Sequence, residues 1–482
     1  MRFSSREWQT KQFESFHLCF PKQIFFMKPD KNAKEPRDSV QIAFDFSGDR
    51  PTCDHGPMLL FERQSMIGRR FFACSAYRDR KLCPAYVLES VWENDKSKGQ
   101  KMAKQSTTQL LLRSRELNQI RENILMRHDL KMKDRGFCHS CGEIFVTMGQ
   151  HVNHKVTAAV GDNLLDEPSK ILDPLDHSKK EAQYFFSEDS INVILGLLQD
   201  AKVSHVLCIS CPTIFEKLKR DSSKKCLMLD LDVRFRQFYS PQEYLLYNMF
   251  NHHFFDGSQS VSVYEQFLIE GKNNLAVVMD PPFGGKVEVI SHTLQTIDDE
   301  YKHLNGQNAS DISKFWIFPY FMESQIVSNL PSFAMLDYKV EYTNHSQFQK
   351  GPQGRKQGSP VRIFTNVSLQ KLKLPAREGY KYCTFCKKWI SPENRHCMIC
   401  NSCTSKDGRT YVHCDQCKRC VKPTWIHCWK CKRCALAEHP CMLFQERSKD
   451  TATAKKKKVS SPSPVTAKST SDNWIVTESR NT

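Results

Sequence analysis

The residues with the clearest chemical potential are Asp280, Pro281, Pro282 and Phe283, which follow the hydrophobic run 275–279 and precede two glycines. Such a run predicts a buried strand, so the four residues should form the turn at its end. The Asp280 carboxylate and the Pro281 carbonyl can accept hydrogen bonds from an exocyclic aromatic amine, and the Phe283 ring can stack on a flat base. Because proline lacks an N–H, this turn stays rigid. A Pro-Pro turn after a strand is also common without such chemistry, so the surrounding elements must decide.

Those elements favour a catalytic interpretation. Between residues 170 and 370, short β-rich runs alternate with helical patterns, which indicates a βαβ-type sheet. The last two strand segments, 335–345 and 361–367, are separated mainly by the loop 349–359, so we expect an antiparallel hairpin there. The motif therefore follows a central strand of an α/β domain.

In this setting, residues 280–283 resemble the (D/N)PP(F/Y) catalytic signature of class I S-adenosylmethionine-dependent amino-methyltransferases. The resemblance implies a Rossmann-like α/β fold with a mostly parallel seven-stranded sheet and S-adenosylmethionine as cofactor. It also implies that the catalytic residues are Asp280, Pro281, Pro282 and Phe283.

The resemblance further implies where the cofactor binds. The Gln-Tyr-Phe-Phe run at 183–186 resembles the segment that cups the methionine moiety, and Asp230, or alternatively Asp232, ends the second strand where an acidic residue accepts the ribose hydroxyls. Asn248 and Met249 follow the third strand and would border the adenine, although Met249 fits a core position equally well. The expected cofactor-binding residues are Gln183, Tyr184, Phe185, Phe186, Cys208, Asp230, Asn248, Met249 and Asp280.

One departure concerns the turn after the first strand, 205–209. Many such enzymes have G-x-G-x-G there, which lets the backbone approach the cofactor. Here Ser210 and Pro212 take those places. The contacts of residues 208–213 with the cofactor are therefore open.

Cysteine and histidine gather in three regions, of which the first spans residues 53–83. Four nitrogen and sulfur ligands suit tetrahedral Zn²⁺. With Gly-Arg-Arg-Phe-Phe at 68–72, this region resembles a GRF-type zinc finger, a module associated with single-stranded nucleic acid. That family usually opens C-x-C, so the histidine at position 55 replaces a cysteine; the alternative is a set of unrelated buried thiols. The expected ligands are Cys53, His55, Cys74 and Cys83.

The second region is a compact C2H2 arrangement at 138–154. Only nine residues separate its two halves, fewer than in the usual DNA-reading finger. We therefore expect a structural zinc that braces the next domain, the alternative being no metal. The expected ligands are Cys138, Cys141, His151 and His154.

The third region repeats the unit H-C-x-x-C-x-x-C three times, which favours up to four tetrahedral zinc ions. The sequence leaves open which ligands share an ion. Between residues 377 and 441, 13 Lys and Arg residues outnumber 5 Asp and Glu residues and are interleaved with aromatic residues, a pattern that suits RNA loops or single strands. A structural or protein-docking module is the alternative. The expected ligands are Cys383, Cys386, His396, Cys397, Cys400, Cys403, His413, Cys414, Cys417, Cys420, His427, Cys428, Cys431, Cys434, His439 and Cys441.

The 482-residue chain carries 70 Lys and Arg against 53 Asp and Glu, so its formal charge of +17 favours a polyanionic partner. No apolar run reaches the ~20 residues of a membrane span, and the first residues lack a signal-peptide core. We expect an intracellular, reduced compartment, where 21 cysteines are metal ligands rather than disulfides. The expected domains are an irregular segment at 1–50, the GRF-type finger at 51–95, a basic helical linker at 96–135, the C2H2 finger at 136–156, the methyltransferase at 165–375, the Cys/His-rich module at 380–443 and a disordered Lys/Ser-rich tail at 444–482.

Taken together, the order of modules over about residues 50–441 resembles the zinc-finger CCHC-domain-containing adenine-N6-methyltransferases of large-subunit rRNA. This implies N6-methyladenosine formation in large-subunit rRNA, partners in ribosome biogenesis or RNA processing, a nuclear or nucleolar location with the cytoplasm as a further option, and no membrane. The family carries a further CCHC knuckle, whereas here the chain passes from Cys441 into a Lys-rich segment. Two alternatives stay open: a protein lysine methyltransferase with a related core, and a non-catalytic RNA-binding scaffold. Loop 349–359 could border the substrate entrance, or it is simply a solvated hairpin loop.

Overall fold

The computed structural model describes residues 40–46, 48–64, 69–103, 109–125, 131–175, 182–348, 352, 354–356 and 358–441. Nearly all of the predicted N-terminal segment and the whole predicted tail lie outside these residues. The chain divides into two units, Met1–Tyr411 and Val412–Thr482, each of which is described by itself. Among the described residues, none of the helices has the length and apolar character needed to span a membrane.

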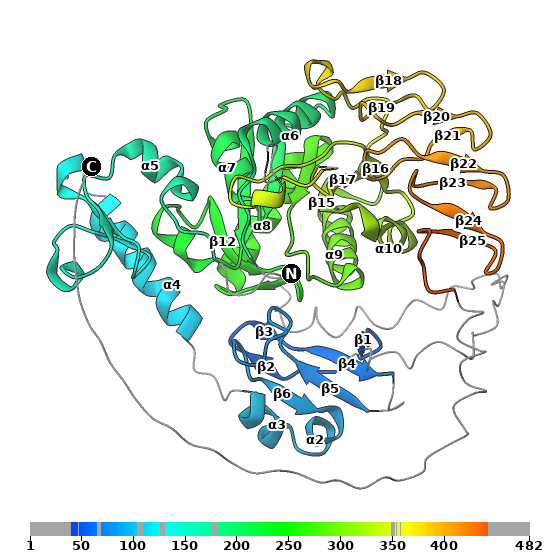
Figure 1. Ribbon diagram of the computed structural model, residues 1–482. Coiled ribbons are helices and arrows are strands. Elements are labelled where there is room, and N and C mark those ends of the chain that lie inside the picture. Colours follow the sequence, from blue (N-terminus) through cyan, green and yellow to red (C-terminus); the bar gives the residue numbers. More distant parts are fainter. Residues whose placement is uncertain are drawn as a thin grey trace, which may run out of the picture. The chain divides into compact units, whose positions relative to one another are not determined.

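The first unit is built around one large sheet with the strand order β13-β12-β11-β10-β14-β15-β17-β16 (Figure 1). The neighbours from β12 to β15 pair in parallel, whereas β13 and β17 run antiparallel to their neighbours. The seven expected strands are present, and the two-residue β13 adds an eighth at one edge. The strands are β10 (His205–Ile209), β11 (Lys225–Asp230), β12 (Tyr244–Asn248), β13 (His253–Phe254), β14 (Leu275–Met279), β15 (Ser313–Pro319), β16 (Ala334–Leu336) and β17 (Val361–Thr365).

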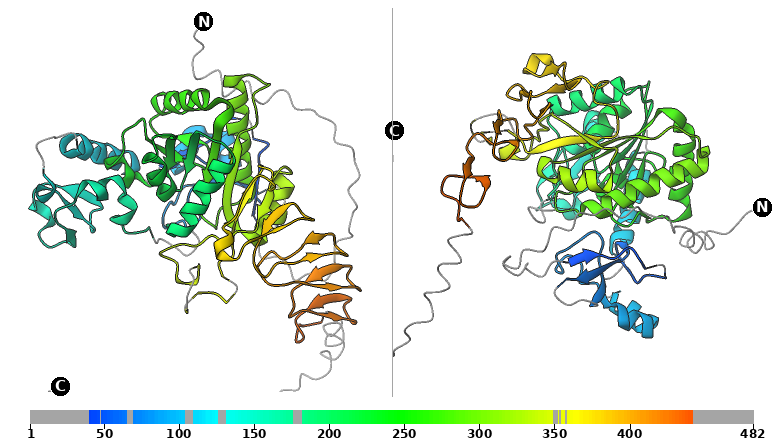
Figure 2. Two further views of the ribbon diagram at one scale, coloured as in Figure 1. Left: turned by 90° about the horizontal axis from the view of Figure 1, so that it is seen from above. Right: turned by 90° about the vertical axis from the view of Figure 1, so that its right-hand side faces the viewer.

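Helices cover both faces of this sheet (Figure 2). Parallel strands buried on both faces read as continuous hydrophobic runs, and Leu275–Met279 is buried throughout. Successive side chains alternate between two cores: Val206 and Cys208 face one, and Leu207 and Ile209 face the other. The first core is closed by α6 (Glu188–Asp200) and α7 (Pro212–Lys219), and the second by α8 (Ser258–Gly271), α9 (Val287–Asn305) and α10 (Glu323–Asn329).

The strand order creates a crevice at one end of the sheet. Chain progression reverses between β10 and β14, and in such sheets ligands bind beyond the carboxyl ends of the strands at this switch point. The predicted closing hairpin is confirmed, since Ala334 pairs with Thr365 antiparallel. The fold therefore places the ends of β10, β11, β12 and β14 around one site.

The first zinc module has its own small sheet, of order β1-β4-β5-β6, and its own core. The fully buried Ala103 belongs to that core, so the module extends beyond the predicted boundary at 95. The expectation of an irregular N-terminal segment is wrong for Val40–Ile42, which pairs with β4; this pairing depends on tertiary structure that a three-residue segment does not reveal. The elements are β1 (Val40–Ile42), β2 (Thr52–Cys53), β3 (Gly56–Pro57), β4 (Leu59–Arg63), β5 (Arg70–Ala73), β6 (Tyr86–Leu88), α2 (Glu89–Asn94) and α3 (Lys96–Ala103).

The predicted helical linker is confirmed as α4 (Gln109–Ile120), which continues into a π-helical turn, η1 (Arg121–Leu125). It docks on the large domain, where the Arg236 guanidinium donates to the Ser114 hydroxyl at 3.3 Å. The second zinc module is a three-stranded sheet of β7 (Gly136–Cys138), β8 (Glu143–Phe145) and β9 (Val156–Thr157). Shorter helical turns are η2 (Met132–Asp134), η3 (Gly149–His151), α5 (Asp162–Asp166), η4 (Pro168–Lys170), η5 (Val233–Gln237), η6 (Lys272–Asn274), η7 (Tyr320–Met322), η8 (Ser346–Phe348) and η9 (Ala376–Glu378).

The Cys/His-rich module consists of short β-hairpins that follow the sequence repeat. In each, the residue after the second cysteine of a C-x-x-C pair has a positive φ: Lys387, Asn401, Lys418 and Lys432, with φ between 46° and 52°. Non-glycine residues rarely adopt this conformation, so its recurrence indicates one repeated turn geometry. The hairpins are β18 (Lys381–Cys383) with β19 (Lys388–Ile390) and β20 (His396–Cys397) with β21 (Ser402–Cys403) in the first unit, and β22 (Val412–Cys414) with β23 (Arg419–Val421) and β24 (Ile426–Cys428) with β25 (Arg433–Ala435) in the second.

Candidate active site and metal centres

The turn after β14 presents the predicted catalytic residues at the switch point. The Asp280 amide still follows the sheet ladder and donates to the Ile209 carbonyl at 3.1 Å. The chain then turns sharply, because the Gly285 amide donates to the Pro282 carbonyl at 2.7 Å. A Cβ at position 285 would lie 3.0 Å from that carbonyl oxygen, so the close approach favours glycine. This rigid turn holds the four predicted residues at the crevice.

A pocket opens there, and most of the predicted site residues line it. The cofactor and catalytic positions that share the pocket are Gln183, Tyr184, Asp230, Asn248, Met249, Asp280, Pro281, Pro282 and Phe283. Ser210 and Asp232, which sequence reasoning had considered, line it as well. Its remaining walls, which sequence reasoning missed, come from Ala76, Tyr77, Leu175, Ala182, Leu231, Tyr247 and Phe250.

Three predicted cofactor residues are placed elsewhere. Cys208 is fully buried within β10 and faces the core under α6 and α7, because the pocket opens beyond the strand and not along it. Phe186 stacks on the Tyr342 ring with centroids 5.0 Å apart, in the core behind the pocket. Phe185 is also buried and does not line the pocket. The structure therefore assigns these three side chains to packing.

Two distant segments pair to complete the wall beside Asp280. The Ser187 amide donates to the Glu341 carbonyl at 2.9 Å, and the Thr343 amide donates to the Phe185 carbonyl at 2.8 Å. This pairing brings Tyr342 to the motif, where its hydroxyl donates to the Asp280 carboxylate at 3.0 Å. Tyr342 therefore contacts a predicted catalytic residue, a contact that spacing along the chain could not reveal.

The electrostatic state of Asp280 reflects two opposing effects. Burial raises the pKa of Asp280 well above its ordinary value, because the low-dielectric surroundings disfavour the charged carboxylate. The hydrogen bond from Tyr342 acts in the opposite direction and lowers that pKa. Tyr342 therefore helps to keep Asp280 able to accept hydrogen bonds.

Aromatic rings surround Phe283 beside this carboxylate. Its ring centroid lies 5.8 Å from that of Tyr184, 6.1 Å from Tyr342 and 6.2 Å from Phe348. On the sheet side, the Phe318 ring meets it edge-on at 6.0 Å. Such a set of rings can hold a planar base next to an acceptor of hydrogen bonds.

The opposite end of the pocket is acidic. Burial, followed by the neighbouring charge of Asp232, raises the pKa of Asp230 to about 7. Asp232 forms an ion pair with Arg234 at 2.7 Å, and Gln183 bridges the two, donating to Asp232 and accepting from Arg234 at 3.2 Å each. Ligand hydroxyl groups that donate to Asp230 would stabilise its carboxylate form.

The turn after β10 has Ser210 in a backbone conformation that glycine adopts readily. Ser210 has φ of +52°, the left-handed region that a glycine would occupy, and its amide donates to the Leu229 carbonyl at 3.0 Å. Pro212 is the first residue of α7, a position that proline favours. With acidic acceptors at Asp230 and apolar walls at Met249, the pocket chemistry fits the nucleoside of S-adenosylmethionine.

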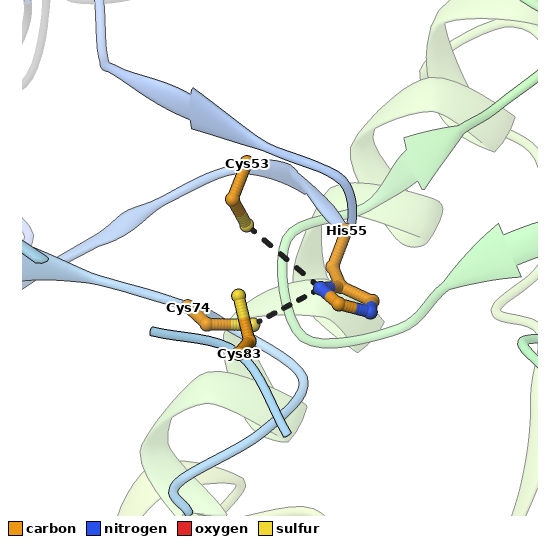
Figure 3. A group of neighbouring side chains, drawn as sticks. All are labelled: Cys53, His55, Cys74 and Cys83. Carbon is orange, nitrogen blue, oxygen red and sulfur yellow. Dashed lines mark hydrogen bonds between the residues drawn. The ribbon is translucent and has the colours of Figure 1, made fainter. Parts of the chain in front are cut away.

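The first zinc module brings its four predicted ligands together (Figure 3). The ligand atoms lie within 4.8 Å of one another, and the His55 Nδ1 is 3.5 Å from the Cys74 Sγ and 4.0 Å from the Cys53 Sγ. Zn–S and Zn–N distances near 2.3 and 2.0 Å require about 3.5 Å between sulfur and nitrogen in a tetrahedron. The donor set and its spacing therefore fit a Zn²⁺ ion.

The second module satisfies the same test. The His154 Nδ1 lies 3.4 Å from the Cys138 Sγ and 3.3 Å from the Cys141 Sγ, and His151 lies 3.6 Å from Cys141. Behind this set, the Gln237 side chain accepts from the Ile144 amide and donates to the Gly142 carbonyl, both at 2.8 Å. These bonds attach the zinc module to η5, next to the Arg234 that holds the pocket's acidic end.

In the Cys/His-rich module, ligands from successive repeats interleave. Neighbours such as His427 and Cys428 belong to different sets, because adjacent side chains of a strand point in opposite directions. The Cys417 Sγ lies 3.3 Å from the His427 Nδ1, while the Cys428 Sγ lies 4.0 Å from the Cys441 Sγ. The sets within one unit are Cys383, Cys386, His396 and Cys403, then Cys414, Cys417, His427 and Cys434, and finally Cys428, Cys431, His439 and Cys441.

Four predicted ligands remain after these sets are formed. In the first unit, the Cys400 amide donates to the Cys397 Sγ at 3.5 Å. In the second unit, the Cys420 Sγ lies 3.9 Å from the His413 Nδ1. The fourth zinc ion that the sequence allows for this module stays a prediction.

Comparisons with known proteins agree with the pocket's chemistry. A family model described as probable N6-adenine methyltransferase matches residues 177–367. The chain is 42% identical over 374 residues to the rRNA N(6)-adenosine-methyltransferase ZCCHC4 of Homo sapiens, covering 74% of this chain and 72% of that protein. The protein of the same name from Xenopus laevis is 42% identical over 369 residues, covering 72% of each chain. That of Mus musculus is 41% identical over 388 residues, covering 77% of this chain and 74% of the relative.

Proposed function

Because the chain belongs to the family of rRNA N(6)-adenosine-methyltransferases named ZCCHC4, we propose that it methylates the N6 atom of an adenosine in large-subunit rRNA. One observation carries the proposal for this particular chain. The pocket combines a Tyr342-bound Asp280 carboxylate and the Phe283 ring with an acidic end at Asp230. The pocket thus offers adjacent binding sites for the acceptor base and for a nucleoside cofactor.

S-adenosylmethionine, when bound, supplies an electrophilic methyl group on its sulfonium. The adenine N6 is a poor nucleophile, because its lone pair is delocalised into the ring. Asp280 and the Pro281 carbonyl accept hydrogen bonds from the two N–H groups, which favours pyramidal nitrogen and aims its lone pair at the methyl carbon. Gln183 and Asp230 would hold the cofactor, whose methyl carbon would bond to N6 as its C–S bond breaks, and the displaced N6 proton would pass to the Asp280 carboxylate that it hydrogen-bonds. Phe283 holds the base flat throughout.

The chain's own residues also prepare the acceptor. Tyr342 keeps the Asp280 carboxylate oriented and favours its charged form. The target adenine must leave its stack to reach Asp280, which is easiest in a loop or bulge. The zinc ions have structural roles, and the basic Cys/His-rich module supplies charge for the RNA backbone.

A protein lysine methyltransferase is the first alternative. The excess of Lys and Arg in the Cys/His-rich module argues against it, because this charge complements RNA. The test offers deproteinised rRNA and total protein, both from cells lacking the enzyme, together with labelled S-adenosylmethionine. We expect label in the RNA; label in the protein alone would overturn the proposal.

A non-catalytic scaffold is the second alternative, motivated by the missing glycine turn. The left-handed Ser210 weakens that argument, because it reproduces the backbone conformation that the glycine would supply. Calorimetric titration with S-adenosylmethionine separates the two. We expect a saturable heat with one site per chain, whereas no heat at high micromolar cofactor would favour the scaffold.

We also propose a nuclear or nucleolar location, with proteins of ribosome biogenesis or RNA processing as partners. The support is the substrate itself, because large-subunit rRNA is made and processed there, together with the formal charge of +17. Microscopy of the tagged full chain beside a nucleolar marker is the test. Exclusion from the nucleus would contradict the proposed location.

A further inference from the structure

We propose that the first zinc module forms part of the cofactor pocket, with Tyr77 closing its adenine end, so that zinc binding in this module and cofactor binding support each other. The inference rests on the proposed function. It assigns to a module expected to bind nucleic acid a second role, in the binding of S-adenosylmethionine. Ala76 and Tyr77, which immediately follow the ligand Cys74 and its neighbour Ser75, both line the pocket.

The position of Tyr77 depends on two zinc ligands. Its amide donates to the Cys74 Sγ at 3.4 Å, so the backbone at Tyr77 follows the knuckle around that sulfur. Its ring packs edge-on against the His55 imidazole, with centroids 4.8 Å apart. Loss of the metal would release both ligands from their fixed geometry and, with them, the tyrosine.

Hydrogen bonds attach the zinc ligand His55 to the end of β12. The Asn248 side chain, buried at the pocket wall, donates to the His55 carbonyl and to the Ser75 hydroxyl, both at 2.8 Å. The Asn251 side chain donates to the carbonyls of His55 at 3.0 Å and Pro57 at 2.8 Å. The module is therefore fixed to the end of β12 by Asn248, which lines the pocket, and to the following loop by Asn251, which does not.

Further contacts show that this docking is close. A Cβ on Gly56, whose φ is +91°, would lie 2.5 Å from the His253 ring, so the Gly56 backbone packs against this side chain as closely as only a glycine allows. The Lys286 ammonium donates to the Val40 carbonyl, and the Phe44 and His292 rings lie 5.1 Å apart. The wall that the module adds is thus anchored on both β12 and α9.

Tyr77 meets the pocket on the side of β12, whereas Ser75 and Ala76 of the same knuckle also line a second hollow with Pro282 and Gly285. β12 is three strand positions away from β14, about 14 Å at the usual strand spacing, and Asp280 follows β14. Asn248 and Met249 at the end of β12 are the residues expected to border the adenine. A tyrosine held beside them can stack on or edge the adenine ring, whereas the acceptor base belongs beside Phe283.

Mutual support is a thermodynamic requirement if this arrangement holds. A ligand that binds better to the zinc-loaded module must in turn increase the affinity of the module for zinc by the same factor. S-adenosylhomocysteine, which contains the same nucleoside, is a suitable probe. It should slow the loss of one zinc equivalent to a chelator while leaving the zinc ions of the Cys/His-rich module unprotected.

The experiment uses the full chain and measures S-adenosylhomocysteine binding by calorimetry and zinc release with a colorimetric chelator. We expect Tyr77→Ala to weaken binding about tenfold, as loss of one aromatic contact with a base does, and to abolish the protection of one zinc. Tyr77→Phe should retain both properties. Asn251→Ala, which alters docking outside the pocket, should weaken binding by a smaller factor. Tyr86→Ala is the matched control, because Tyr86 lies in the same module on β6 and does not line the pocket.

Three results would overturn the inference. If the wild type binds S-adenosylhomocysteine and Tyr77→Ala binds it with the same affinity, the cofactor role of Tyr77 is refuted while the proposed function stays intact. An unchanged probe affinity with a raised KM for RNA would place Tyr77 on the acceptor side instead. Equal weakening by Tyr77→Ala and Tyr86→Ala would reduce the effect to general destabilisation of the module. Failure of the wild type to bind the probe would instead count against the proposed function itself.

Discussion

Replacing Tyr342, a fully buried residue, with phenylalanine removes the hydroxyl that donates to the Asp280 carboxylate. The ring should keep its place, since Phe186 stacks on it at 5.0 Å and its surroundings are apolar. The lost interaction is a 3.0 Å hydrogen bond to the Asp280 carboxylate, which lowers the pKa of Asp280 against the effect of burial. A hydrogen bond to a charged group is worth about 1.5–3 kcal/mol. The variant should therefore disfavour the ionised carboxylate by about ten- to a hundredfold.

The direction of the pH dependence follows from the effect of the Tyr342 hydroxyl on the pKa of Asp280. Without the Tyr342 hydroxyl, the pKa of Asp280 rises further, so a higher pH is needed to ionise the group. Single-turnover methyl transfer should therefore be reduced most strongly at low pH, and the rising limb of the rate profile should move to higher pH. At sufficiently alkaline pH, the variant should approach the wild-type rate.

The assay measures single-turnover label transfer to rRNA across a pH series, with cofactor saturating at every point. Tyr338→Phe is a matched control, because Tyr338 is a buried tyrosine of the same core that does not line the pocket. A uniform loss of rate in Tyr342→Phe at every pH would refute the reasoning. So would an identical shift in the control.

Further predictions concern the cofactor end, the catalytic turn and the zinc ions. Burial raises the pKa of Asp230 to about 7, so the affinity for S-adenosylhomocysteine should fall as the pH drops below that value, by about tenfold per pH unit. Calorimetry of Asp230→Asn should show weaker binding that does not depend on pH. Gly285→Ala places a Cβ 3.0 Å from the Pro282 carbonyl and should slow single-turnover transfer at least about tenfold with little change in cofactor affinity. The 24 candidate ligands, four to an ion, predict six zinc ions per chain by elemental mass spectrometry, and His427→Ala should hold one fewer. A count that His427→Ala leaves unchanged would contradict the proposed ligand set.

Local patterns in the sequence predicted many of the residues that the structure brings together at the pocket. Asp280 could be placed because a continuous apolar run, a Pro-Pro turn and two glycines form one contiguous signal. Asp230 could be placed because it ends another such run. The zinc ligands could be recognised because the C-x-x-C spacing and the adjacent His-Cys pairs are patterns that place ligand atoms around a metal ion. In each case, neighbours along the chain are also neighbours in space.

The missed residues reach the site through tertiary contacts instead. Tyr342 reaches the Asp280 carboxylate because its segment pairs with residues 185–187, more than 150 positions earlier in the chain. Tyr77 arrives because a separate zinc module docks on β12 through Asn248. Cys208 was misplaced because the family pattern marks a strand and its turn, whereas exposure to the pocket depends on which residue ends the strand. Ser210 is the opposite case. The sequence lacks the usual glycine there, yet the residue adopts the left-handed conformation that glycine favours.

The central claim is that Asp280 orients an adenine amine for methyl transfer. The most direct measurement incubates deproteinised rRNA, from cells lacking this enzyme, with labelled S-adenosylmethionine and either the wild type or Asp280→Ala, and then digests the RNA to nucleosides. The account predicts label in N6-methyladenosine with the wild type and its loss in Asp280→Ala at saturating cofactor. Label in another nucleoside, or full activity in Asp280→Ala, would contradict it.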